Sequence, residues 1–166
     1  YSPAVTETLQ SAHTGIFQYE NIIRFLDIVS EWGDECMEEL DHMVMASNSK
    51  NKEKSFNTGL KCIETWNQTT LNEEQRRITM KYPECQGLYE FCYMAAVEES
   101  KSERFAKGPP SLSEFCHNYL TRLAKSPHTK NRNYFHLEPL SKRVLLMNVF
   151  RSAVHDCVFS HMKYIP

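Results

Sequence analysis

Apolar side chains in this chain recur at steps of three and four residues. Through residues 4–31 the apolar positions are Ile16, Tyr19, Ile22, Ile23, Leu26 and Val29. This spacing puts the side chains on one face of an α-helix, so it indicates an amphipathic helix. Val, Ile and Thr form no alternating runs, so the pattern does not indicate a sheet.

Turn-forming residues are sparse, because the 166-residue chain contains only 5 Gly and 7 Pro. Strand-and-turn folds usually need more of them. We therefore predict an all-α, single-domain fold over residues 1–166, built as a helical bundle or an orthogonal array of about six to seven helices. The expected helices cover about residues 4–31, 36–44, 54–66, 72–81, 84–100, a segment after Ser111, and 139–162.

Several local signals set the expected helix ends. Gly33 and Asp34 suit a helix stop followed by a new N-cap, so we expect a break there. Ser111 and Glu114 have capping-box spacing, and Pro139 suits a first helical turn. The helix over 84–100 is apolar on all sides, which predicts a central, buried helix.

The chain begins at Tyr1 rather than Met. We therefore expect either a processed product or a fragment of a longer chain. A removed signal peptide is compatible with both. It contains no run of about 18 apolar residues, so the sequence predicts no membrane-spanning helix.

Charge is unevenly distributed although the net charge is only −2. Residues 20–41 hold eight acidic residues and one basic residue, whereas residues 122–143 hold six basic residues and one acidic residue. The two segments either face each other inside the fold or face different partners. Candidate partner-binding residues lie in both segments: Glu31, Glu35, Glu38, Glu39, Asp41, Lys125, Lys130, Arg132, Tyr134 and Phe135.

The six cysteines leave two environments open. An even count permits disulfides in a secreted protein, with 15 possible pairings. Most of them, however, lie beside apolar residues at helical spacing, where a free cysteine acts as a small core side chain. We therefore expect reduced thiols and an intracellular protein, cytoplasmic or nuclear. The alternative is a secreted protein with a glycan on the Asn67 sequon.

The segment HDCVFSH, residues 155–161, gathers groups that bind metals. Cys157 and His161 share a helix face, and Cys85 and Cys92 share another. One arithmetically possible zinc set is therefore Cys85, Cys92, Cys157 and His161. No tight C-x2-C or C-x4-C knuckle is present. We therefore predict no metal site and interpret the segment as the end of an ordinary amphipathic helix.

No catalytic motif is present, so we predict neither an enzyme nor a cofactor. The adjacent Cys116 and His117 do not face each other on a helix. The resulting hypothesis is a non-enzymatic α-helical module that binds another protein, with self-association as one form. The alternatives are a secreted four-helix-type ligand with disulfides and a zinc-supported nucleic-acid-binding domain. The latter would use the basic and aromatic residues of 125–136.

Overall fold

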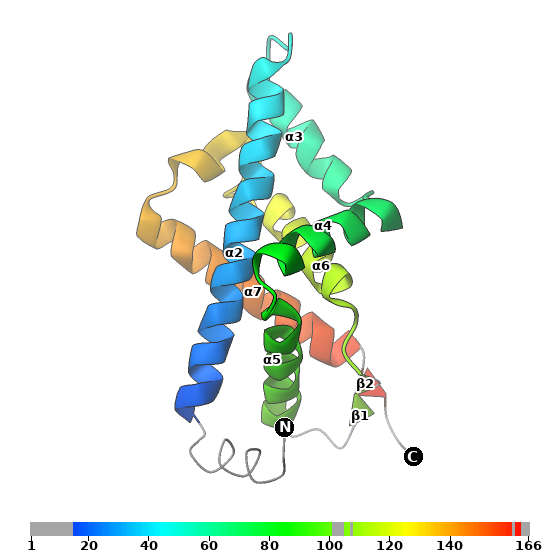
Figure 1. The fold of residues 1–166 in the computed structure, drawn as a ribbon. Helices are drawn as coiled ribbons and strands as arrows, with labels where there is room; N and C mark the ends of the chain where they lie inside the picture. Colours follow the sequence, from blue (N-terminus) through cyan, green and yellow to red (C-terminus); the bar gives the residue numbers. More distant parts are fainter. Residues whose placement is uncertain (1–14, 101–104, 107, 161, 164–166) are drawn as a thin grey trace.

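The computed structural model describes residues 15–100, 105–106, 108–160 and 162–163 and confirms the all-α prediction. Within these ranges lie six α-helices and one 3-10 helix, η1 (Figure 1). Their bounds are α2 Gly15–Ala46, α3 Lys52–Ile63, α4 Gln68–Lys81, α5 Cys85–Ser100, α6 Leu112–Lys125, η1 Lys130–His136 and α7 Pro139–Ser160. β1 (Phe105–Ala106) and β2 (Met162–Lys163) form a two-residue antiparallel pair.

Helix α2 runs the length of the molecule (Figure 1). Its 32 residues correspond to about 48 Å. The predicted break at Gly33 is wrong, because α2 passes through this residue without interruption. A Cβ atom at Gly33 would lie 3.1 Å from Cε1 of Tyr119. Gly33 therefore allows the close approach of α6 rather than ending a helix.

Helix α6, not α5, is the most deeply buried helix. Eight of its 14 residues are buried: Leu112, Ser113, Phe115, Cys116, Tyr119, Leu120, Leu123 and Ala124. Helix α5 buries one face through Cys85, Tyr89, Cys92 and Tyr93, while Met94 is 61% exposed. The prediction of a central helix over 84–100 is therefore wrong, since apolar composition alone did not show which faces of that helix are covered.

An aromatic cluster joins four helices at the centre of the core. The ring of Phe115 in α6 lies 5.4 Å from that of Phe25 in α2, 5.2 Å from Tyr89 in α5 and 6.0 Å from Phe150 in α7. Offset and tilted rings at such separations attract each other in addition to the apolar area they bury. The cluster therefore fixes how α2, α5 and α7 pack against α6.

Side-chain caps set several helix starts. The Ser111 side chain accepts a hydrogen bond from the Glu114 backbone N–H, which is the N-cap bond of the predicted capping box. Asn51 and Asn67 cap α3 and α4 in the same way. The last helix begins at Pro139 as predicted. No helix in the described ranges combines the length and the apolar character needed to cross a membrane.

Candidate functional site

An apolar groove lies between α2, α5 and α7, the three helices that the aromatic cluster joins to α6. Its volume is about 500 Å³, which falls in the range of ligand-binding pockets. Its walls come from three helices: Tyr19, Ile22, Ile23 and Leu26 of α2, Cys92, Ala95, Ala96, Glu98 and Glu99 of α5, and Met147, Phe150, Arg151 and Val154 of α7. Most of these side chains are apolar, although the groove opens to solvent.

A stripe of exposed apolar side chains extends the groove along α7. Leu140 and Val144 are 77% and 50% exposed, and Met147 and Val154 continue the same face into the groove. Steps of four, three and seven residues keep these side chains on one side of a helix. Leu140 and Val144 lie outside the buried face of α7, which carries Leu146, Val149, Phe150 and Ala153.

The rim of the groove carries charges of both signs. Glu98 and Glu99 stand on the α5 side and are exposed, and Arg151 is exposed on the α7 side. Tyr19, 65% exposed, contributes an aromatic ring from α2. An apolar floor with a charged rim is the usual anatomy of a protein-binding surface.

The acidic segment of α2 is largely neutralised within the fold. Three aspartates at intervals of seven residues meet the basic segment: Asp27 pairs with Arg143 at 2.8 Å, Asp34 with Lys142 at 2.8 Å and Asp41 with Arg132 at 2.6 Å. The two oppositely charged segments therefore face each other, one of the two alternatives left open by the sequence. The pairs run along one side of α2, since a spacing of seven residues is close to two helical turns.

The glutamates of α2 face α4 instead. Arg77 contacts Glu35 at 2.8 Å and Glu39 at 2.5 Å, and Lys81 contacts Glu31 and Glu35 at 2.8 Å each. The hydrogen bond from Lys81, helped by that from Arg77, lowers the pKa of Glu35 despite partial burial, which acts in the opposite direction. Of the proposed acidic face, Glu38 is exposed and belongs to none of the ion pairs among the described residues.

Replacing Glu35 with glutamine is expected to lower the free energy of unfolding at pH 7 by about 1 kcal/mol, because this network is only partly buried. The folded-state pKa of Glu35 lies below its ordinary value of 4.5. Its stabilising effect is therefore fully present above that value and is lost as the pH falls through the folded-state pKa.

Urea unfolding from pH 7 to pH 3 measures this effect. The difference between wild type and E35Q should close at acid pH, while the matched variant E38Q should follow the wild type throughout. A constant difference at every pH would show that the charge of Glu35 is not what stabilises the fold.

The residues of the predicted basic face have mixed roles. Lys125 and Lys130 are exposed, and Lys125 pairs with Glu64 at 2.9 Å. Arg132 donates hydrogen bonds from Nε and Nη2 to the two carboxylate oxygens of Asp41. Tyr134 is 1% exposed and its hydroxyl donates a hydrogen bond to Asp34. Phe135 packs against Phe56 in a T-shaped arrangement, with the ring centroids 5.6 Å apart. Tyr134 therefore belongs to the core rather than to an accessible face.

The segment HDCVFSH is the end of α7 as far as Ser160, and His161 lies outside the described residues. Cys157 is buried, with its sulfur 3.4 Å from the Tyr89 hydroxyl. His155 is exposed and lies against the Phe159 ring at 4.3 Å. Across the described ranges, no three His, Cys, Asp or Glu side chains gather as metal ligands would.

All six cysteines are free thiols, and only Cys62 is exposed. Burial raises the pKa of Cys85 and of Cys92 to about 12 and that of Cys36, Cys116 and Cys157 as well. A thiol with a raised pKa is a poor nucleophile at neutral pH. His117 points away from Cys116: its Nε2 lies 2.7 Å from the Ile63 carbonyl oxygen, and its ring stacks on Trp66.

The apolar groove was missed at the sequence level. Its residues follow the same three-and-four spacing as the core, so the sequence gives no sign that they line an open groove.

No family model matches the chain, and neither a curated protein nor a solved structure is detectably similar to it.

Proposed function

We propose that this chain is a non-enzymatic helical module that binds another protein by taking one of its amphipathic helices into the groove between α2, α5 and α7. The observation that carries the proposal is the continuous apolar lining of a groove open to solvent. Exposed apolar surface of this kind is costly in water and usually marks a binding surface.

The dimensions and chemistry of the groove favour a helix as the occupant. The stripe from Leu140 to Val154 covers 14 residue steps, which correspond to about 21 Å along α7, or nearly four turns of a partner helix. Helices that dock into grooves offer apolar side chains at positions i, i+3, i+4 and i+7. The glutamates on one rim and Arg151 on the other favour a partner helix with basic residues on the first flank and acidic residues on the second.

We propose that the module works inside the cell, and the free buried thiols support this because disulfides are rare in reducing compartments. The exposed side chains Glu38, Lys125 and Lys130 remain candidates for additional contacts with the partner.

A peptide-binding experiment tests the proposal. The probe is a fluorescein-labelled helical peptide of 16 residues with leucines at i, i+3, i+4, i+7 and i+11, lysines on one flank and glutamates on the other. We expect saturable binding by fluorescence anisotropy. The variant Ala95→Trp should weaken it at least about tenfold, equivalent to about 1.4 kcal/mol, because the indole fills the groove.

The control variant makes the same change at a remote site. Ala46→Trp introduces a tryptophan at the exposed C-terminal end of α2, the opposite end from the groove (Figure 1). It should bind like the wild type, and both variants should keep the wild-type circular dichroism. Equal affinity of the two variants for the peptide would contradict the proposal.

Sedimentation equilibrium distinguishes a second copy of the chain from another protein. A dimer that dissociates in Ala95→Trp but not in Ala46→Trp would identify a second copy as the occupant and replace the proposed heterologous partner. A monomer that binds the peptide supports the proposal as stated.

A further inference from the structure

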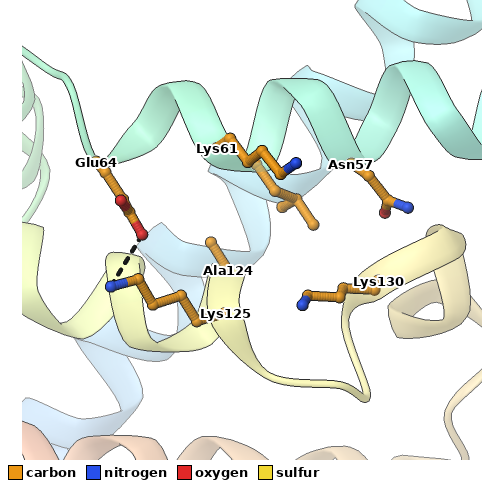
Figure 2. A pocket seen from close by; sticks show the side chains of 7 residues that line it. Asn57, Lys61, Glu64, Ala124, Lys125 and Lys130 are labelled. Carbon is orange, nitrogen blue, oxygen red and sulfur yellow. Dashed lines mark ion pairs between the residues drawn. The ribbon is translucent and has the colours of Figure 1, made fainter.

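A second pocket, separate from the groove, lies between α3, the end of α6 and the start of η1 (Figure 2). Its volume is about 350 Å³, enough for a small metabolite. The walls include three lysines, namely Lys61 of α3, Lys125 of α6 and Lys130 of η1. The pocket thus draws its charged groups from three elements, of which α3 is distant in the sequence from the neighbouring α6 and η1.

The pocket carries excess positive charge. Three ammonium groups face one carboxylate, that of Glu64, and Lys125 already binds it at 2.9 Å. In the part of the chain that the structure describes, no carboxylate pairs with Lys61 or Lys130. Figure 2 shows the Lys61 side chain lying along α3 on one side of the pocket and the Lys130 side chain extending across the opposite side. Like charges that face a common space repel each other, and an anion between them removes that repulsion.

Two hydrogen bonds link the elements of one wall. The side-chain amide of Asn57 donates to Oδ1 of Asn131 at 2.7 Å, and the Asn131 backbone N–H donates to Oδ1 of Asn57 at 2.7 Å. Asn131 has φ 60°, the left-handed conformation that asparagine tolerates better than most residues. This reciprocal pair holds the start of η1 against α3 and so positions Lys130 opposite Lys61.

The remaining wall is apolar. Leu60 is 3% exposed and Ala124 4% exposed, and both line the pocket. A ligand that fits therefore combines a compact, doubly charged head with a body that makes van der Waals contact. A lysine ammonium group acts as a point charge with several donors and suits such a head.

We propose that this pocket binds a small organic phosphate monoester, with the phosphate between Lys61 and Lys130 and the organic body over Leu60 and Ala124. Lys125 stays with Glu64 and closes one side of the site. The assignment does not depend on the groove between α2, α5 and α7, because the two pockets share no residue.

Isothermal titration calorimetry with AMP, adenosine and inorganic phosphate tests this site on the whole chain. AMP should bind, adenosine should not, and inorganic phosphate should bind more weakly than AMP because it lacks the body. Lys61→Gln and Lys130→Gln should each weaken AMP at least about tenfold, since each removes a charged donor. Lys50→Gln, which removes an exposed lysine outside the pocket, should leave the affinity unchanged.

Glu64→Gln provides a test in the opposite direction. It removes the only carboxylate of the pocket and releases Lys125, so the affinity for AMP should rise by about three- to tenfold. Adenosine binding as tightly as AMP, inorganic phosphate binding in preference to AMP, or lysine variants that bind AMP like Lys50→Gln would each overturn the proposal. Circular dichroism and the melting temperature confirm that every variant is folded.

Discussion

Replacing Phe115 with alanine is expected to destabilise the folded chain by about 4 kcal/mol. Its side chain is 2% exposed and lies at the centre of the ring cluster formed with Phe25, Tyr89 and Phe150. The substitution removes a whole ring between α2, α5, α6 and α7. Three neighbouring rings then lose their contacts, and a rigid aromatic shell collapses only partly into the cavity.

Thermal and urea denaturation measure this effect. For a domain of this size, 4 kcal/mol corresponds to a fall in melting temperature of about 10 °C. Met80→Ala is the matched control, because Met80 is 76% exposed on α4, and it should change the stability by less than about 0.5 kcal/mol. If the two variants were equally stable, the ring cluster would not be the centre of the core.

Local signals in the sequence predicted much of the helix pattern. The capping box at Ser111 and the proline at position 139 act through atoms within one turn, so they needed no tertiary information. Expected starts and ends of the helices over 54–66, 72–81 and 84–100 lie within a few residues of those of α3, α4 and α5.

The predictions that failed depended on the neighbours of a helix. Gly33 is of a residue type that often ends a helix. Here its lack of a side chain instead allows Tyr119 of α6, more than 80 residues away in the sequence, to pack closely against α2. Leu140 and Val144 follow the same helical spacing as the buried residues of α7, yet they lie outside its buried face. Periodicity identifies an apolar side chain, but only the packing of α2, α5 and α6 decides which ones are covered.

The ion pairing within the fold could be predicted in part from the charge distribution. Opposite charges on residues 20–41 and 122–143 allowed internal pairing, and the spacing of Asp27, Asp34 and Asp41 was a visible sign of one shared helix side. The sequence did not show that Arg77 and Lys81 of α4 would form ion pairs with the glutamates of α2. The sequence also did not show that Lys61 and Lys130 line the same pocket, since their arrangement depends on the left-handed turn at Asn131.

Loss of the Asp34 carboxylate is expected to have the second-largest effect. Asp34 accepts the hydrogen bond of the buried Tyr134 hydroxyl and pairs with Lys142 at 2.8 Å. Lys142 also lies over the Tyr134 ring, with Nζ 4.8 Å from its centroid. Asp34→Ala should therefore cost about 3 kcal/mol, because it leaves a buried hydroxyl without an acceptor and removes an ion pair.

A double-mutant cycle with Tyr134→Phe isolates the buried hydrogen bond. Tyr134→Phe alone should cost about 1 kcal/mol, since Asp34 keeps Lys142 as a partner. In the Tyr134→Phe background, Asp34→Ala should cost only about 1 kcal/mol, because no hydroxyl is then left unsatisfied. The expected coupling of about 2 kcal/mol, measured by urea unfolding, would identify this contact as the joint between α2 and η1. Additive losses would instead assign the cost of Asp34→Ala to Lys142 alone, and Lys142→Ala would then have to reproduce it in full.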